Sequence, residues 1–328
     1  MQAFVRRSYG SPDVLELTDV GRPRPADDEV LVRVRATSVN PYDWHHLRGQ
    51  PYFARLMPGG FGLGRPKLTV LGCDIAGRVE AVGTGVTLFR PGDDVFALIE
   101  QGGFAEYVSI KEALLAPKPT NLSYEQAAAV PMAAVTALLA LRDVGRLEPG
   151  QQVLINGASG GVGTFAVQIA RALGAKVAGV CSTRNVDLVG SIGADEVIDY
   201  RAEDFTRQAQ RFDLLIDIAG SRSVSASRRV LTRGGTFVVV GGPAGRWMRP
   251  ADRMISALLS GPFVSQRMVV ADSVGRAEKK PLLTTLTGLI ESGRVTPVID
   301  RRYQFTEIPA AVRYQEAGHA PGKVVVSV

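Results

Sequence analysis

The sequence is poor in the residues that bind metals or form disulfides. Its 328 residues include only two cysteines, Cys73 and Cys181, and three histidines. The two cysteines lie far apart and neither belongs to a Cys-x-x-Cys pair, which excludes a disulfide framework and a thiolate zinc site. We therefore expect both thiols to behave as small, buried apolar side chains.

Long apolar runs are also missing. No run approaches the roughly 20 residues that a membrane-spanning helix needs, and the first ten residues lack the apolar centre of a signal peptide. We therefore expect a cytoplasmic protein without membrane contact. The net charge is +6, but lysine and arginine are scattered instead of gathered into a basic stripe with interleaved aromatics. This distribution predicts no nucleic acid partner.

The strand and helix patterns that are present divide the chain into two parts. Short apolar runs separated by Gly, Pro and Asp predict a mostly antiparallel β domain over the first ~120 residues. Beyond a capping box at Ser123-x-x-Gln126, strands and helices alternate, which is typical of a doubly wound parallel sheet in an α/β protein. The segment from Gly49 to Pro66 is expected to be an irregular loop. The expected strands are 3–5, 14–19, 29–36, 76–82, 94–97, 105–109, 197–199, 214–218, 236–240 and 323–328, with helices at 132–142 and 282–291.

One glycine-rich segment predicts a dinucleotide-binding turn. An apolar run at Val153–Ile155 precedes Ala158-x-Gly160-x-x-Gly163, a stretch with helical spacing of apolar residues follows, and Val177–Cys181 forms a second apolar run. Glycines at a strand-to-helix junction let backbone N–H groups approach a pyrophosphate, which the helix N-terminus also attracts. The alternative is a structural turn without a ligand. The residues expected to contact the cofactor are Ala158, Ser159, Gly160, Gly161, Val162 and Gly163.

The end of the second strand indicates which cofactor binds. An Asp or Glu about 20 residues past the glycines would accept the ribose 2′-hydroxyl of NAD. The chain has Ser182 and Arg184 there instead, and a hydroxyl with a planar guanidinium can bind the 2′-phosphate of NADP(H). Two alternatives stay open: Arg184 is an ordinary solvated arginine, or the nearby Asp187 leaves room for NAD(H).

Several motifs in order carry a resemblance to a known family. Beside the glycine turn at 156–163, they are the segments 39–43, 72–77, 91–95, 102–107, 193–200 and 239–243. With these motifs the chain resembles the medium-chain dehydrogenase/reductase superfamily over nearly its whole length. The resemblance is to the zinc-free, quinone-oxidoreductase-like branch.

The resemblance implies a domain arrangement and a set of cofactor contacts. It implies a GroES-like catalytic barrel at 1–122, a Rossmann NADP-binding domain at 123–270, and a return segment at 271–328 that completes the barrel. It also implies a homodimer. Tyr200 would enclose the 2′-phosphate, or it is only a strand-end aromatic packed on a loop. The other residues implied to bind the cofactor are Asn40, Thr136, Gly241, Gly242 and Lys323.

The resemblance also bears on metal binding. Zinc-dependent relatives hold their metal with a Cys, a Gly-His-Glu motif and a later Cys or Asp. Here Asn40 stands at the first position, Gly72-Cys73-Asp74 at the second, and the third ligand is missing around 132–134. A carboxamide is a poor zinc ligand. His45 and His46 are adjacent and could not easily share one ion, so we expect no bound metal.

Chemistry without a metal narrows the reaction class. Alcohol oxidation needs a Lewis acid or general base, whereas hydride addition to an enone or quinone needs only an oxygen poised by hydrogen bonds. The Asn40 carboxamide can donate to the substrate oxygen or to the cofactor, or it merely caps a turn before Pro41. Tyr52 lies near the position of a proton-donating Tyr in related enoyl-thioester reductases, or it is a loop aromatic. Trp44 and Phe53 suit a small, planar, apolar substrate.

Three functions remain open at this point. The first is an NADPH-dependent reductase of quinones or α,β-unsaturated carbonyls. The second is an enoyl-thioester reductase that acts on carrier-bound chains, and the third is a redox sensor that binds NADPH without turnover. Turnover of a small enone would exclude the sensor, and a comparison of a free enone with its thioester would separate the two enzymes.

Overall fold

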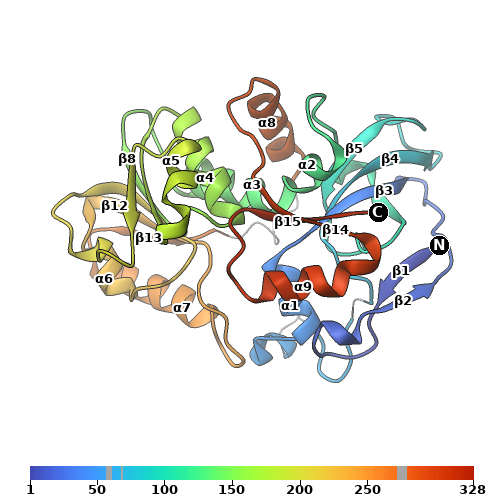
Figure 1. Ribbon diagram of the computed structural model, residues 1–328, viewed down its shortest axis with the longest axis horizontal. Helices are drawn as coiled ribbons and strands as arrows, with labels where there is room; N and C mark the ends of the chain where they lie inside the picture. The colour runs from blue at the N-terminus through green and yellow to red at the C-terminus, as the bar shows by residue number, and fades with distance from the viewer. Residues whose placement is uncertain (57–60, 68, 272–278) are drawn as a thin grey trace. The chain divides into compact units, whose positions relative to one another are not determined.

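The computed structural model describes residues 1–56, 61–67, 69–271 and 279–328. They form two units, each built on its own large sheet (Figure 1). Unit 1 comprises Met1–Met132, the described part of Arg276–Glu291, and Pro297–Val328; unit 2 comprises the described part of Ala133–Gly275, and Ser292–Thr296. Helix α2 (Tyr124–Ala128) contacts β3, β4 and β15 and therefore belongs to unit 1, beyond the boundary expected at residue 122.

Unit 1 is organised around a seven-stranded sheet in the order β14-β15-β3-β4-β5-β7, with β6 paired to β3. Every pairing in it is antiparallel except β14 with β15. The strands are β3 (Glu29–Val39), β4 (Asp74–Val82), β5 (Asp94–Leu98), β6 (Tyr107–Lys111), β7 (Leu115–Pro117), β14 (Ile299–Gln304) and β15 (Lys323–Ser327), with β1 (Gln2–Val5) and β2 (Glu16–Asp19) in a second sheet. The helices are α1 (Pro41–Arg48), α2, α8 (Lys280–Glu291) and α9 (Ile308–Glu316).

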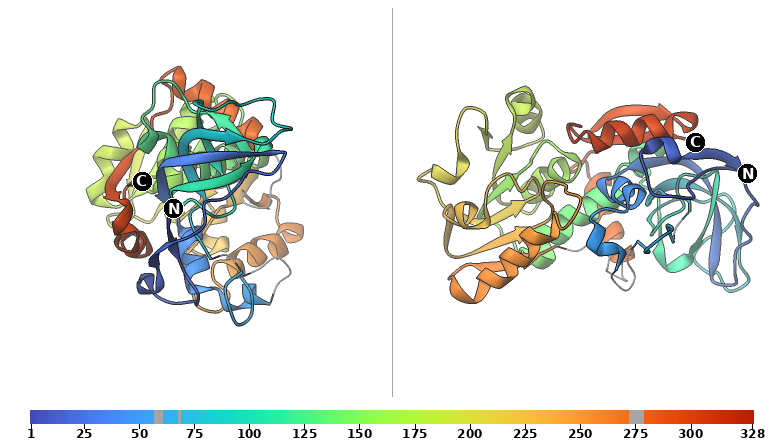
Figure 2. Two further views of the ribbon diagram at one scale, coloured as in Figure 1. Left: turned by 90° about the vertical axis from the view of Figure 1, so that its right-hand side faces the viewer. Right: turned by 90° about the horizontal axis from the view of Figure 1, so that it is seen from below.

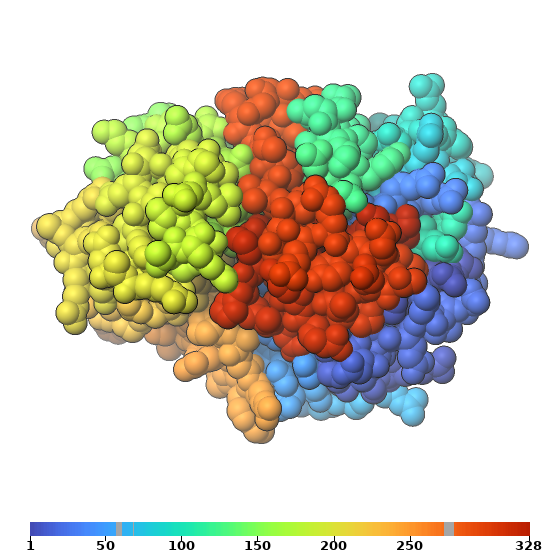
Figure 3. Space-filling view, viewed as in Figure 1, coloured from blue at the N-terminus to red at the C-terminus, as the bar shows by residue number. Residues whose placement is uncertain are grey.

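Strand β3, near the start of the chain, pairs with β15, the last strand. In its first half, buried Val32 and Val34 alternate with exposed or half-buried arginines, the period expected of a strand with one face in the core. Its last residues are buried because β4 pairs with one edge and β15 with the other, where Val324 faces Val39. Helix α9 then packs beside the N-terminal turn Pro12–Val14 (Figures 1 and 3).

Unit 2 contains a six-stranded parallel sheet in the order β10-β9-β8-β11-β12-β13. This is the doubly wound order, in which the succession of strands reverses between β8 and β11. Helices cover both faces of the sheet (Figure 2), which explains strands of nearly continuous apolar residues. The predicted Rossmann fold is confirmed. Its elements are α3 (Pro131–Leu138), β8 (Gln152–Asn156), α4 (Gly161–Ala172), β9 (Lys176–Cys181), α5 (Val186–Ser191), β10 (Glu196–Asp199), β11 (Phe212–Asp217), α6 (Val224–Arg228), β12 (Leu231–Val239), α7 (Ala251–Ser260) and β13 (Arg267–Val270).

Some predicted elements differ from the structure in their bounds, such as the strand expected at 105–109, which is β6 at Tyr107–Lys111. The strand expected at 14–19 begins only at Glu16, because Pro12 opens a 3-10 turn. The helix expected at 132–142 is α3 followed by a π-helical turn, Leu139–Val144. Within the loop expected at 49–66, residues 57–60 lie outside the described residues, and Tyr52–Arg55 form a 3-10 turn. Among the helices of the described ranges, none is long and apolar enough to cross a membrane.

Candidate active site

The dinucleotide turn lies between β8 and α4. Gly157 follows β8 with a φ of +96°, and α4 begins at Gly161. A Cβ on Gly163 would lie 2.1 Å from the carbonyl oxygen of Gly157, so the helix passes the strand end at a distance that only glycine permits. The first N–H groups of a helix have no intrahelical carbonyl to bond. This cradle therefore fits the anionic pyrophosphate of a dinucleotide.

Ala158 replaces the first glycine of the usual fingerprint without blocking the turn. Its side chain is fully buried, and its backbone N–H donates to the carbonyl oxygen of Val180 at 3.0 Å. A Cβ on Gly179 of β9 would come within 3.0 Å of the Ala158 methyl. The methyl thus fills space that Gly179 leaves open, on the side of the turn that faces the sheet.

A polar cluster stands where β9 ends. The side-chain amide of Asn185 donates to the hydroxyl oxygens of Ser159, at 3.0 Å, and of Ser182, at 3.4 Å. Asn185 and Ser182 are nearly buried, whereas Arg184 between them is exposed. The structure thus ties the predicted Ser182 to the glycine turn through Asn185. Asn185 was not among the predicted residues, although it follows Arg184 directly.

Strand β10 ends beside β9 and adds a carboxylate to this edge. Asp199 pairs with Cys181 in the sheet register and accepts a hydrogen bond from the Thr183 hydroxyl at 2.6 Å. That bond and one from the backbone of Arg201 hold the pKa of Asp199 below its usual value. Tyr200 follows with 46% of its surface exposed. Asp187, the residue that left room for NAD(H), lies exposed on α5.

The carboxyl ends of β8, β11 and β12 are joined by a second hydrogen-bond network. The amide of Asn156 donates to one carboxylate oxygen of Asp217 at 2.7 Å, and Arg253 of α7 binds the other. The N–H of Gly241 bonds to the backbone oxygen of Asp217, and Arg253 packs beneath Gly242. This network supports the turn that holds Gly241 and Gly242.

Thr136, another residue implied to bind the cofactor, lies on α3 and is nearly buried.

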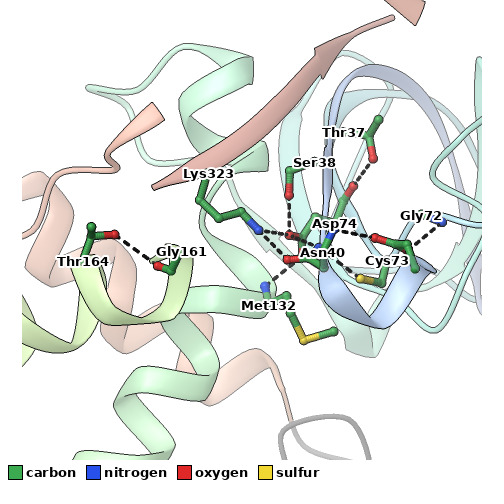
Figure 4. Close-up of polar contacts among 11 residues, drawn as sticks. Thr37, Ser38, Asn40, Gly72, Cys73, Asp74, Met132, Gly161, Thr164 and Lys323 are labelled. Atoms are coloured by element: carbon green, nitrogen blue, oxygen red, sulfur yellow. Dashed lines mark hydrogen bonds and ion pairs between the residues drawn. The ribbon is translucent and has the colours of Figure 1, made fainter. Parts of the chain in front are cut away.

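Unit 1 contains a closed polar cluster formed by Ser38, Asn40, Cys73, Asp74 and Lys323, which we name the Asn40 cluster (Figure 4). The Lys323 ammonium donates to Asn40 Oδ1 and, at 3.2 Å, to Asp74 Oδ2. Asn40 Nδ2 donates to Asp74 Oδ2 at 2.9 Å and to Cys73 Sγ at 3.3 Å. Asp74 also accepts from the Ser38 hydroxyl and the Met132 backbone. All five residues are at most 3% exposed.

Asn40 occupies the N-cap position of α1, but its side chain is committed to the Asn40 cluster. Asp43, the third residue of the helix, supplies the acidic side chain of a capping box: its carboxylate accepts from the backbone N–H of Asn40 at 2.8 Å, and also from that of Gly72, outside the helix, at 3.1 Å. Complete burial raises the pKa of Asp43 to about 7 despite these two bonds. Burial also raises the pKa of the Cys73 thiol, which keeps it protonated.

Comparison with known proteins decides the family. The chain matches the model of the alcohol dehydrogenase GroES-like domain over residues 26–120 and that of the zinc-binding dehydrogenases over 192–326. The bovine (Bos taurus) mitochondrial NAD(P)H oxidoreductase RTN4IP1 is 32% identical over 366 residues, which cover all of this chain and 89% of that protein. The chain belongs to the medium-chain dehydrogenase/reductase superfamily.

Two further relatives place the chain within this superfamily. The 2-methylene-furan-3-one reductase of tomato (Solanum lycopersicum) is 34% identical over 340 residues, which cover 99% of this chain and 79% of that protein. The structure of Escherichia coli quinone oxidoreductase complexed with NADPH superposes with a TM-score of 0.85 and 25% identity, over 100% of both chains. The chain is therefore an oxidoreductase of the quinone-oxidoreductase-like branch and uses a nicotinamide cofactor.

The Asn40 cluster does not fit a zinc ion, although one matching family model bears the name of zinc-binding dehydrogenases. A cation already binds there, because the Lys323 ammonium contacts both Asn40 and Asp74. Cys73, the second candidate ligand, is fully buried, and its sulfur accepts a hydrogen bond from Asn40 Nδ2 at 3.3 Å. Across the described ranges of the chain, no group of three His, Cys, Asp or Glu side chains could hold a metal ion.

The adjacent histidines on α1 each lie against a backbone carbonyl oxygen and an aromatic ring. His45 stacks on Trp44 with ring centroids 3.8 Å apart, and its Nδ1 lies 2.9 Å from the carbonyl oxygen of Gln50. His46 Nδ1 lies 2.9 Å from the Tyr42 carbonyl oxygen. Burial lowers the pKa of both, to about 4 for His46, so both rings are neutral at pH 7. The two rings therefore lie against different backbone carbonyl oxygens, those of Gln50 and Tyr42, and do not point their Nδ1 atoms at one common position.

Tyr52, the other predicted catalytic residue, is half-buried in the 3-10 turn after α1. Its hydroxyl accepts from the Gln50 side chain at 3.5 Å, and the Arg55 guanidinium lies 4.8 Å from its ring centroid. Asn40 and Lys323 thus share one cluster, while Tyr52 belongs to a different segment of unit 1.

Proposed function

We propose that this oxidoreductase transfers hydride from NADPH to a quinone or to the activated C=C bond of an α,β-unsaturated carbonyl, without zinc. The Asn40 cluster is the observation that carries the proposal. Its charges are paired internally, so it offers no Lewis acid and no free base to take a proton from an alcohol. Reduction of a conjugated acceptor needs neither.

The chain's own residues would bind and orient the cofactor. The pyrophosphate would lie on the N–H groups of the turn from Ala158 to Gly163, with Thr136, Gly241 and Gly242 beside the nicotinamide. When bound, the reduced nicotinamide supplies the hydride. Asn40 would orient the nicotinamide nucleoside, and Tyr52 would donate a proton where the acceptor requires one. Transfer rates depend steeply on such alignment.

We propose NADPH over NADH because of the polar cluster at the end of β9. Ser159, Ser182 and Asn185 offer hydroxyl and amide groups there, with the exposed Arg184 beside them. These groups suit a phosphate. Tyr200 would flank the same position. The ribose acceptor that NAD requires is missing from residues 182–185.

The reaction class has a direct test. With NADPH deuterated at C4, we expect the label at the β-carbon of a small enone and the α-proton from solvent, because hydride adds at the β-carbon of a conjugated acceptor. Mass spectrometry and NMR of the product measure this. A free enone and its thioester, assayed side by side, would separate the reductase from the enoyl-thioester alternative. Label at the carbonyl carbon, or faster oxidation of simple alcohols, would refute the proposal.

Zinc should be dispensable. Prolonged treatment with a chelator should leave kcat and KM unchanged, because a lysine ammonium already binds the oxygen atoms of Asn40 and Asp74. NADPH oxidation before and after chelation, with elemental analysis of both samples, measures this. One zinc per chain together with activity loss on its removal would contradict the expectation.

We also propose a cytoplasmic homodimer formed through unit 2. An apolar patch on and around α7 is exposed, and it lies next to β13, the last strand in the sheet order. A second copy could cover the patch and extend the sheet at that edge.

The molar mass from light scattering should be twice 35.0 kDa, and the double variant Leu259→Glu, Phe263→Ser should be a monomer. A monomeric parent protein at micromolar concentration would rule this out. The patch comprises Trp247, Met248, Ile255, Leu258, Leu259 and Phe263.

A further inference from the structure

We infer that Asp74 and Lys323 are positioning residues that fix the polarity of the Asn40 carboxamide, an inference that rests on the proposed reductase function. The two ends of a carboxamide have nearly the same size, so its neighbours decide which end points where. An ammonium can only donate, and it lies against Oδ1. A carboxylate can only accept, and it lies against Nδ2. The two charges therefore select one orientation.

The same two charges oppose the reversed orientation. A rotated amide would place its NH2 group against the Lys323 ammonium and its oxygen against the Asp74 carboxylate, so that donors face donors and acceptors face acceptors. The Lys323 side chain is 4% exposed and that of Asp74 is fully buried, so little water can relieve such a mismatch. Bonds from the Ser38 hydroxyl and the Met132 backbone keep the carboxylate in place.

This polarity determines what Asn40 can offer a bound cofactor. Both amide hydrogens are used, one by Asp74 and one by Cys73. Oδ1 accepts one bond from Lys323 and retains a second lone pair. Asn40 therefore acts as a hydrogen-bond acceptor, suited to a hydroxyl or amide N–H of the nicotinamide nucleoside and unsuited to the carbonyl oxygen of a substrate. Lys323 acts through Asn40 instead of binding the cofactor directly.

The experiment compares NADPH binding with turnover in Lys323→Met. We expect kcat with a quinone to fall by ~10–100-fold, because a misplaced nicotinamide transfers hydride slowly. The dissociation constant of NADPH, from fluorescence quenching, should rise less than about 10-fold, the value of one neutral hydrogen bond. In an Asn40→Ala background, Lys323→Met should cause no further loss of kcat, since the group that it orients is gone.

Three companion variants keep the test decisive. Lys323→Gln retains a donor toward Asn40 and should recover most of kcat, and Asp74→Asn removes the opposing charge and should lower kcat in the same direction. If Lys323→Met does not fold, these two decide the outcome. Lys118→Met is the matched control, because the Lys118 ammonium also bonds to two oxygens in unit 1, those of Pro119 and Leu122. It should leave kcat unchanged.

The results against the inference are distinct from those against the proposed function. An NADPH affinity that falls as much as kcat would make Lys323 a direct cofactor ligand and overturn the inference. Losses that multiply in the Asn40→Ala background would do the same. Failure of the unsubstituted protein to oxidise NADPH with any quinone or enone would instead refute the reductase function, whatever the variants show.

Discussion

Gly163→Ala should nearly abolish NADPH binding. The added Cβ would lie 2.1 Å from the carbonyl oxygen of Gly157 and 2.7 Å from the backbone of Ala158, so the start of α4 must move away from the strand end. That movement separates the helix N–H groups from the pyrophosphate position. The loss of two charge-assisted hydrogen bonds at about 1.5–3 kcal/mol each raises the dissociation constant by roughly 10²–10⁴-fold. Fluorescence titration with NADPH measures it.

Gly190→Ala is the matched control for this substitution. Gly190 lies on a helix of the same unit, where an added Cβ would meet nothing closer than 4.0 Å. It should leave NADPH affinity unchanged. Circular dichroism shows whether each variant is folded. A folded Gly163→Ala protein with the affinity of the parent would mean that the cofactor does not bind at this turn.

The dinucleotide turn could be predicted because its parts are neighbours in the chain. Strand β8, the glycines, α4 and β9 follow each other without interruption between residues 152 and 181. The apolar runs, the glycines and the helical period therefore report on one local structure. The doubly wound order followed from the same kind of alternation farther along the chain.

The Asn40 cluster could not be predicted in this way. Lys323 is 283 residues from Asn40, and only the pairing of β15 with β3 brings them together. The alternation of apolar and polar residues predicts a strand, but it does not predict which other strand will pair with it. The sequence identified Asn40 as a candidate from family resemblance, yet its donors and acceptors depend on Asp74 and Lys323, whose side chains meet it only in the folded chain.

Ala158 and Asn185 show the same limit at shorter range. In the sequence, Ala158 stands where the fingerprint usually has a glycine. In the structure its methyl group lies beside Gly179, which has no side chain, so the methyl group fits without a clash. Asn185 reads as an ordinary polar residue after a strand. Its amide joins Ser159 to Ser182 because the turn and the end of β9 lie side by side. Compensation of this kind is visible only in contacts.

Arg184→Asp should narrow or reverse the preference for NADPH over NADH. The change removes a guanidinium from the exposed end of the cluster formed by Ser159, Ser182 and Asn185, and it supplies a carboxylate that repels a 2′-phosphate and accepts from a ribose hydroxyl. Loss of one charge-assisted contact should cost about 1.5–3 kcal/mol, roughly 10- to 150-fold in NADPH affinity. Titration of both cofactors against both proteins measures the ratio.

Arg233→Asp separates this local effect from a general change of charge. Arg233 is an exposed arginine of the same unit, near the start of β12. It therefore lies toward the amino ends of the parallel strands, whereas the dinucleotide turn lies at their carboxyl ends. It alters the net charge by the same amount, so any shared loss of affinity reflects long-range attraction of the anionic cofactor. The difference between the two variants measures the contact itself. Equal cofactor ratios in both variants, or equal affinities for NADPH and NADH in the parent protein, would show that Arg184 does not read the 2′-phosphate.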